Sequence, residues 1–253
     1  MQLVWQIPLI LITGIAAGFL NVVAGGGSLL TLPVLIFLGL PAATANGTNR
    51  VAVAIQCATG VAGFRAKGFS DFRFSTFLTI PAIPGAIIGA IIAVLMGEVA
   101  FKRVLAAIMV GVLALTYLSP TRKSEGTRIE QNLARKIVTM IAFFLIGIYG
   151  GFIQAGVGFI IIGALTSING YDLVRANAIK LFVSFFFTIV ALGIFIYNGN
   201  VDPFLGLTLA LGNATGAWFG SNWAVDRGEK WIKVVLVVTS LAFAIRLVWQ
   251  TLV

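Results

Sequence analysis

Residues 18–28 read Gly-Phe-Leu-Asn-Val-Val-Ala-Gly-Gly-Gly-Ser, and residues 45–50, Ala-Asn-Gly-Thr-Asn-Arg, follow them. An altered copy stands in the second half, where residues 151–158 read Gly-Phe-Ile-Gln-Ala-Gly-Val-Gly and residues 176–180 read Ala-Asn-Ala-Ile-Lys. Both copies lie inside long hydrophobic stretches. Apolar segments that glycine interrupts at corresponding positions of two halves are typical of the binding site of a secondary transporter. The repeat therefore predicts a duplicated membrane protein and also the place of its site.

The composition is that of a protein whose solvent is lipid. Hydrophobic residues make up 59% of the chain and charged residues 10%, whereas a soluble domain has about 25% charged residues. The apolar runs are long, so we expect an all-α, polytopic protein in the lipid bilayer. The net charge of +9 comes from loops, as membrane topology requires, and does not indicate nucleic-acid binding. The first apolar segment has no Lys or Arg before it, so we expect it to be retained rather than cleaved.

Several chemistries are excluded by missing residue types. The chain has no histidine and one cysteine, so it offers no internal disulfide, no His or Cys metal cluster and no Ser–His or Cys–His pair. We therefore expect no metal, no cofactor and no enzymatic activity. All eight acidic residues fall in or beside loops, so no buried carboxylate is available for a cation or for a proton relay within the membrane.

The apolar stretches predict ten segments, five in each half. A full span needs about 20 residues, so the second segment of each half is either a half-helix of a broken span or part of a re-entrant pair. Residues 1–118 and 136–253 then form two transmembrane repeats, joined by a basic linker at 119–135. The predicted segments are Leu3–Val23, Leu29–Leu40, Ala43–Phe64, Phe72–Met96, Phe101–Leu118, Lys136–Ala155, Phe159–Ile168, Leu173–Tyr197, Phe204–Ala224 and Trp231–Val253.

The similarity of the two halves extends along the chain at a nearly constant spacing. A shift of 131 residues aligns residues 67–71 with residues 198–202, and before the glycines the shift is 133. Lys and Arg gather in and beside the first of these loops, whereas the second has none. Equivalent loops with opposite charge bias indicate opposite sides of the membrane, so we expect inverted repeats and a cytoplasmic central loop. Lys102 and Arg103 are exceptions, because this scheme places them outside.

Further glycines predict close contacts between helices. They recur four or eight residues apart, a spacing that lets helix backbones approach one another in lipid. The glycines with this predicted packing role are Gly85, Gly89, Gly97, Gly212, Gly216 and Gly220.

Polar side chains inside the apolar segments are the candidate binding residues, because polar groups are costly in a membrane. We expect Arg50 and Lys180 to reach from the two halves toward one central cavity; the alternative is that both snorkel to the membrane surface. Helices that restart after glycine expose backbone N–H groups, which favours an anion; the alternative role of these glycines is helix packing. The predicted substrate-binding residues are Asn21, Gly25, Gly26, Gly27, Ser28, Thr48, Asn49, Arg50, Gln154, Gly156, Gly158, Asn177 and Lys180.

The repeated runs resemble the TauE/SafE family of sulfite exporters. Residues 18–28, Pro33 and residues 45–49 are similar to the first repeat of that family, and residues 151–158 and 176–180 to its second repeat. The resemblance covers nearly the whole chain. It implies an inner-membrane carrier of duplicated origin for sulfur-containing anions such as sulfite, or for organosulfonates and related carboxylates.

We therefore expect a multi-pass protein of the inner (plasma) membrane that exports small sulfur-containing anions by alternating access. Its partners are the anion and the lipid bilayer. The alternatives are an anion channel and a carrier of another small organic anion, such as a carboxylate. An anion channel would use the same donors to line a continuous pore.

Overall fold

The computed structural model describes residues 2–105, 107, 111 and 132–252. These residues form helices and connections without any strand, which confirms the all-α prediction. Four of the helices, α1, α4, α6 and α8, are long and apolar enough to cross a membrane. The helices are α1 (Gln2–Val23), α2 (Ser28–Phe37), α3 (Ala42–Ala66), α4 (Phe72–Leu95), α6 (Leu133–Phe152), α7 (Val157–Asn169), α8 (Leu173–Tyr197) and α9 (Pro203–Leu252).

The predicted segments agree with the helices to within about three residues from α1 to α4 and from α6 to α8. Two further predictions concern residues that lie largely outside the described part of the chain. The predicted segment Phe101–Leu118 lies mostly outside the described residues, and so does the linker 119–135 as far as residue 131.

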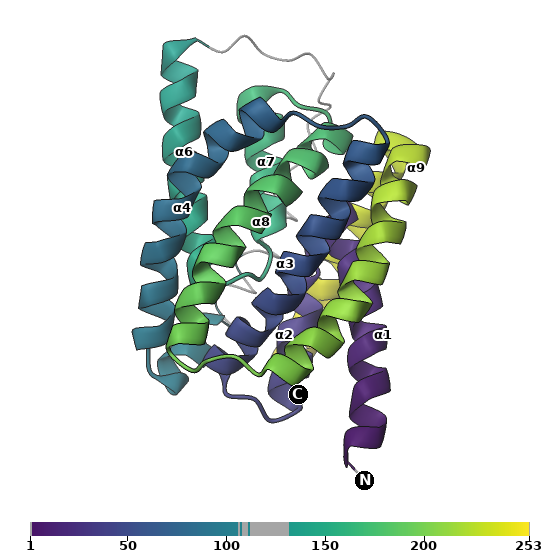
Figure 1. The fold of residues 1–253 in the computed structure, drawn as a ribbon. Helices are drawn as coiled ribbons and strands as arrows, with labels where there is room; N and C mark the ends of the chain where they lie inside the picture. Colours follow the sequence, from purple (N-terminus) through teal and green to yellow (C-terminus); the bar gives the residue numbers. More distant parts are fainter. Residues whose placement is uncertain (1, 106, 108–110, 112–131, 253) are drawn as a thin grey trace.

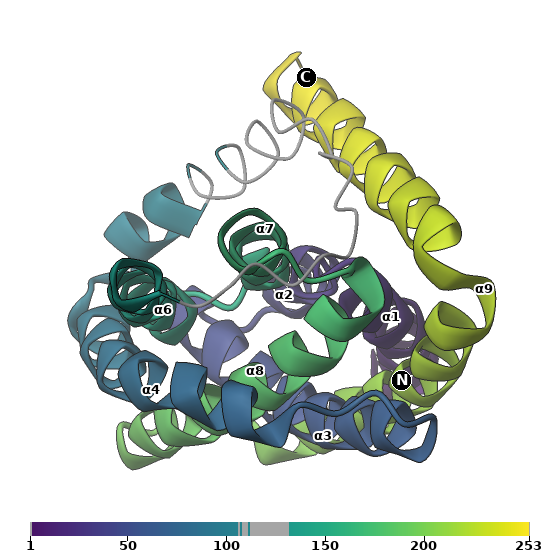
Figure 2. The same ribbon diagram turned by 90° about the horizontal axis from the view of Figure 1, so that it is seen from above.

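The C-terminal part of the chain differs from the prediction. A single helix, α9, covers both predicted segments Phe204–Ala224 and Trp231–Val253, so the predicted break between them is wrong. No proline stands between these segments, and one glycine, Gly228, costs a helix only about 1 kcal/mol. A straight helix of 50 residues would be about 75 Å long, more than twice the thickness of the hydrocarbon core. α9 bends in its middle instead (Figure 2).

Two helical hairpins enter the bundle from opposite ends (Figure 1). α1 starts at the lower end in this view, and α2 returns to that end, where α3 begins. α6 starts at the upper end, and α7 returns there, where α8 begins. Each short helix therefore returns toward the end at which the helix before it starts. That these pairs are re-entrant in the membrane, the second of the two predicted alternatives, stays a prediction. We refer to α1 and α2 as hairpin 1 and to α6 and α7 as hairpin 2.

The longer helices hold the hairpins in place. α3 and α8 pack against each other, α9 packs against α1 and α3, and α4 packs against α6 and α8. Seen from above, α4 lies on one flank of the bundle and α9 runs along the other (Figure 2). Each hairpin is thus held by a flanking helix, hairpin 1 by α9 and hairpin 2 by α4.

Glycine allows the flanking helices to touch the hairpins backbone to backbone. The predicted packing role is wrong for Gly97, because no described atom outside its own chain neighbours lies within 4 Å of where its Cβ would be. It is confirmed for the others, where a Cβ would press against main-chain atoms of the neighbouring helix, namely at Gly85, Gly89, Gly212, Gly216 and Gly220.

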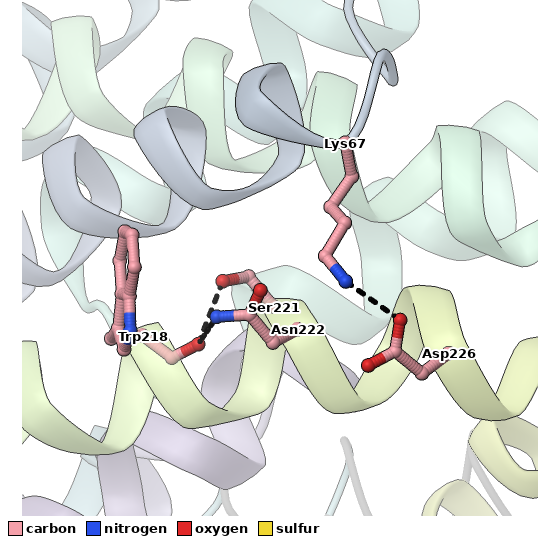
Figure 3. A network of polar contacts seen from close by, with 5 residues as sticks. All are labelled: Lys67, Trp218, Ser221, Asn222 and Asp226. Atoms are coloured by element: carbon pink, nitrogen blue, oxygen red, sulfur yellow. Dashed lines mark hydrogen bonds and ion pairs between the residues drawn. The ribbon is translucent and has the colours of Figure 1, made fainter.

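Polar contacts join α9 to the connection between α3 and α4 (Figure 3). Lys67 Nζ donates to Asp226 Oδ1 at 2.7 Å. Nearby on α9, Ser221 and Asn222 both donate to the carbonyl of Trp218. The side chains of Lys67 and Asp226 are 35% and 60% exposed, so we expect the pair to add little stability. The pair does show that the middle of α9 lies beside the α3–α4 connection.

The start of α3 takes its cap from another part of the chain. The N-cap position, Pro41, makes no side-chain cap. Instead the carboxylate of Glu98 accepts from the Ala42 N–H, at 3.0 and 3.2 Å, and pairs with Lys102 at 2.9 Å. The hydrogen bond from Lys102, and then that from Ala42, hold the pKa of Glu98 below its ordinary value.

The contact between α1 and α9 predicts a sharp difference between two glycine substitutions. A Cβ at Gly18 would lie 2.8 Å from the main-chain carbonyl carbon of Asn213. We expect Gly18→Ala to push the helices apart and to destabilise the protein by about 1–3 kcal/mol, a typical cost of overpacking. Thermal unfolding in detergent measures this effect.

Gly193→Ala in α8 is the matched control. No described atom lies within 4 Å of a Cβ at that position, and alanine is the better helix former. We expect an unchanged or slightly raised Tm. A similar Tm for both alanine variants would contradict the packing role of Gly18.

The low pKa of Glu98 predicts a dependence of stability on pH. Its cap contributes fully above the unfolded-state pKa of about 4.3 and is lost as the pH falls through the lower folded-state pKa. In detergent at neutral pH, we expect Glu98→Gln to have a lower Tm than the unmodified protein. The difference should shrink on acidification below pH 4; a constant difference would show that the charge of Glu98 is unimportant.

Candidate functional site

The turns of the two hairpins meet inside the bundle. Gly25 is in the left-handed region, with φ +96°. A Cβ there would lie 2.5 Å from the carbonyl carbon of Gly158, and a Cβ on Gly158 would in turn press against Gly25. These two glycines are related by the 133-residue spacing of the repeat. Any side chain at either position would force the hairpins apart.

Four helix ends converge at this point. α1 and α6 end here, and α2 and α7 begin here after breaks at residues 24–27 and 153–156. Gly156 permits the second turn through its φ of +73°. Helix ends leave carbonyl and N–H groups without partners in the helix. Because there is no bulk water in the core of a membrane, these groups need partners from the protein.

Lys180 of α8 supplies donors to the end of α1. Its ammonium donates to the carbonyls of Asn21 at 2.7 Å and Val22 at 3.1 Å, and to Asn177 Oδ1 at 2.6 Å. Asn177 in turn donates to the carbonyl of Val23 at 3.0 Å. A positive charge at a helix C-terminus is favourable because the helix dipole is negative there.

Arg50 of α3 does the same for the end of α6. Its Nη1 donates to the Gly150 carbonyl at 3.0 Å and to Gln154 Oε1 at 3.3 Å, and its Nη2 donates to the Gly151 carbonyl at 2.6 Å. The ring of Phe195 lies over the guanidinium, 4.8 Å from its centroid to Cζ. Each hairpin thus has the end of its first helix capped by a cation from the opposite half of the chain.

The side-chain amide of Asn46 also caps a broken helix, although Asn46 is not among the predicted binding residues. Asn46 Nδ2 donates to the Phe152 carbonyl at 2.8 Å. Asn46 aligns with Asn177 under the 131-residue shift. The two amides have equivalent roles, each donating to the last carbonyl of a broken helix. The repeat itself is therefore the signal that identifies Asn46.

The start of α2 is held by hydroxyl and amide groups. Asn49 Nδ2 donates to Ser28 Oγ at 3.0 Å, and Thr31 Oγ1 donates to Asn49 Oδ1 at 2.6 Å. Ser28 and Asn49 are both predicted binding residues. Thr31 is a polar residue of the same apolar segment that the predicted set leaves out, and it belongs to this group. Gly26 and Gly27 form the first turn, since their carbonyls accept from the backbone N–H groups that open α2.

Thr48 is a predicted binding residue whose side chain does not contact the hairpin turns. Its hydroxyl accepts from the backbone N–H of Asp202 at 2.9 Å, in the connection between α8 and α9. Helical positions two residues apart point about 200° apart, so Thr48 and Arg50 lie on opposite sides of α3. The structure brings the other predicted residues to the hairpin turns or to the helices that cap them.

The charge of this region is positive. The side chains of Arg50 and Lys180 are buried, with 0% and 2% of their surface exposed, which rules out the alternative that they snorkel to the membrane surface. Within the described part of the chain, no carboxylate forms an ion pair with either cation. A buried charge is costly without a partner, and helix dipoles compensate it only partly. The region is therefore suited to an anion.

No described group of three His, Cys, Asp or Glu residues could hold a metal ion. The donors at the hairpin turns are amide, hydroxyl, ammonium and guanidinium groups, together with backbone N–H. Such donors are suited to an anion.

A family model described as "Sulfite exporter TauE/SafE" matches residues 10–247. The chain belongs to the TauE/SafE family. The matched range contains both hairpin turns and all the residues that cap the broken helices.

Curated relatives of this TauE/SafE chain are named as membrane transporters, not enzymes. A "Probable membrane transporter protein ORF9" from Sinorhizobium is 27% identical, with 91% of this chain and 88% of the relative covered. A probable membrane transporter of Haemophilus influenzae is 24% identical over 94% and 92% of the two chains. The Escherichia coli protein YfcA, also named a probable membrane transporter, is 26% identical over 93% and 87%. No solved structure matches this chain.

Removing the Lys180 ammonium should destabilise hairpin 1. Lys180→Met keeps the length of the side chain but leaves two carbonyls of α1 without donors. Hydrogen bonds between membrane helices contribute about 0.6 kcal/mol each on average, so we expect a loss on the order of 1–2 kcal/mol. Thermal unfolding in detergent tests this, with Lys67→Met at the surface as the matched control. Equal Tm values for the two variants would mean that Lys180 does not support α1.

Proposed function

We propose that this protein is a secondary transporter that exports small sulfur-containing anions, such as sulfite or organosulfonates, by alternating access. One observation carries the proposal: two buried cations, without carboxylate partners among the described residues, lie where two broken hairpins meet. Family membership supports the class of substrate, and the names of the relatives support transport. Broken helices that meet near the middle of a membrane are typical of the sites of secondary transporters.

The binding site that we propose lies between the two hairpin turns and the capping faces of α3 and α8. The starts of α2 and α7 add positive helix dipoles to the charges of the two cations. The proposed substrate-binding residues contact the anion or position the groups that contact it; they are Asn21, Gly25, Gly26, Gly27, Ser28, Thr48, Asn49, Arg50, Gln154, Gly156, Gly158, Asn177 and Lys180. Of these, Thr48 has the weakest support, because its hydroxyl is engaged with the α8–α9 connection.

We further propose that residues 1–118 and 136–253 are inverted repeats. The packing supports this organisation, since α1 lies against α9 as α6 lies against α4, and α3 lies against α9 as α8 lies against α4. The hairpins enter from opposite ends of the bundle (Figure 1). Inverted hairpins that meet at Gly25 and Gly158 would let one repeat rock against the other around a fixed central site.

Charge supports a membrane orientation in which the linker 119–135 is cytoplasmic. The α3–α4 connection, the start of α6 and the α7–α8 connection lie at one end of the bundle (Figure 1). A hydrogen bond from Tyr171 to Asp71 joins two of these segments. This end carries many of the Lys and Arg residues, including Arg65, Lys67 and Arg135. The positive-inside rule then places it in the cytoplasm, with the protein in the inner membrane.

Counterflow into proteoliposomes tests the proposed transport. Vesicles preloaded with unlabelled sulfite should take up ³⁵S-sulfite transiently and with saturation, because a carrier exchanges its substrate across the membrane. Arg50→Ala should abolish the uptake, and Lys67→Gln, at the surface, should leave it unchanged.

Other results would identify a different function. Persistent single-channel currents without counterflow would indicate an anion channel. Counterflow of acetate but of neither sulfite nor methanesulfonate would indicate a carboxylate carrier. The absence of counterflow for all these anions would contradict the proposal that this protein is a carrier of small anions.

A further inference from the structure

We infer that the two buried cations have different tasks: the Nε edge of Arg50 contacts the transported anion, whereas Lys180 is a positioning residue that holds α1. The ligand class is a small anion with at least two oxygens on one centre, as in sulfite, a sulfonate or a carboxylate. This inference deepens the proposed function and rests on it for the statement that the bound anion is also the transported one.

Lys180 has no donor left for a ligand. An ammonium group has three N–H donors. All three have acceptors in the structure: the carbonyls of Asn21 and Val22 on α1, and the side chain of Asn177. An anion could reach this ammonium only by breaking one of its caps of α1 or by displacing the side chain of Asn177. Lys180 therefore acts on the site through the position of hairpin 1.

Arg50 has donors to spare. A guanidinium has five N–H donors, and the bonds to Gly150, Gly151 and Gln154 use three of them. Nε is completely buried and has no hydrogen-bond partner among the described residues. The two remaining donors are therefore the Nε–H and one N–H of Nη2. Nη2 is the terminal nitrogen that lies on the same side of the guanidinium as the Nε–H.

The surroundings of Arg50 leave one direction of approach. Nη1 and Nη2 bond to the consecutive carbonyls of Gly150 and Gly151, so the far end of the guanidinium faces α6. The ring of Phe195 covers a face of its plane at 4.8 Å. What remains is the edge formed by Nε and Nη2. Two parallel donors on that edge match two oxygens of one oxyanion, which a spherical halide cannot reproduce.

The unpaired Nε of Arg50 would also make the binding of an anion energetically favourable. Native structures leave few buried donors without a partner, and an unmade hydrogen bond from such a group costs about 1–3 kcal/mol, and more for a charged group. Within the described residues, Nε of Arg50 is the only charged atom among the buried side-chain atoms that lack a partner. An oxyanion at this edge would remove that cost and balance the positive charge.

A neighbouring unpaired acceptor refines the ligand class. Asn46 lies one turn before Arg50 and bonds to the same end of α6 through its Nδ2. Since the Phe152 carbonyl can only accept, the amide orientation follows, and Oδ1 of Asn46 is the buried atom without a partner. Residues four apart share a helix face. The anion that fits both residues offers oxygens to Arg50 and one hydrogen-bond donor to Asn46, as hydrogensulfite does.

Binding to the purified full-length protein in detergent tests the role of Arg50. The probes are methanesulfonate and chloride, and the readout is the rise in Tm with ligand concentration. Arg50→Lys is the decisive variant, because a lysine can still cap α6, as Lys180 caps α1, but has no fork of donors. We expect methanesulfonate to stabilise the unmodified protein more than chloride does, and Arg50→Lys to weaken its binding about 10- to 100-fold.

A second variant keeps the test decisive if Arg50→Lys folds poorly. Gln154→Glu has nearly the same shape and strengthens the bond to Arg50, so we expect it to fold. Its carboxylate would compete with the anion for the guanidinium and lower methanesulfonate affinity. Unchanged affinity in Gln154→Glu, or in a folded Arg50→Lys, would overturn the inference, as would a complete lack of methanesulfonate binding in the unmodified protein.

A pair of ligands tests the contact with Asn46. Ethanesulfonate and hydroxymethanesulfonate have the same charge and nearly the same size, but only the second carries a hydroxyl donor. We expect the hydroxyl compound to bind several-fold more tightly, consistent with one added hydrogen bond. Equal affinities would exclude the contact with Asn46.

The binding and transport results separate the two proposals. Arg50-dependent binding of methanesulfonate without counterflow of any sulfur anion would leave the site standing and remove the transport function. Counterflow of sulfite at an unchanged rate in Arg50→Lys would leave the transporter standing and remove Arg50 as the anion contact.

Discussion

The broken ends of α1 and α6 are the constraint on which this structure depends. Their last carbonyl groups lie inside the bundle, where an unsatisfied backbone group costs several kcal/mol. The chain meets this need with long cationic side chains from the opposite half, Lys180 for α1 and Arg50 for α6. Two asparagines complete the caps at Val23 and Phe152. One requirement, the capping of these buried carbonyl groups, therefore links the two hairpins, the helices that cap them and the positive charge between them.

The use of cations as helix caps also determines which ligands the region between the two hairpin turns can bind. Placing two cations in the interior without a described carboxylate partner leaves the region electropositive. The starts of α2 and α7 both place the positive ends of their helix dipoles at this centre. A fold that needed only helix caps could have used neutral amides throughout, as it does at Asn46 and Asn177. The choice of charged groups beside these amides is what connects structural support with the recognition of an anion.

Glycine makes this polar centre possible by bringing backbones together. Gly25 and Gly158 allow the two turns to touch, and glycines on α4 and α9 bring these helices against hairpins 2 and 1. In lipid, where hydrophobic burial does not drive helices together, such close packing supplies much of the attraction between them. The capping side chains can reach their carbonyls only because the helices are this close. The packing of these glycines and the arrangement of the capping side chains thus depend on one geometry.

The sequence by itself determined the membrane environment, most helices, the two glycine breaks and the two cations, because hydropathy, glycine and charge act over a few residues of chain. It also identified the family through its paired motifs. Its pattern could not decide between a break and a continuous helix near Gly228, since one glycine costs too little to end a helix. Only the tertiary structure decided which groups the cations meet. The partner of Arg50 at Gly150 is 100 residues away and that of Lys180 at Asn21 is 159 residues away. Contacts over such distances depend on how the helices pack, and local sequence patterns do not encode them.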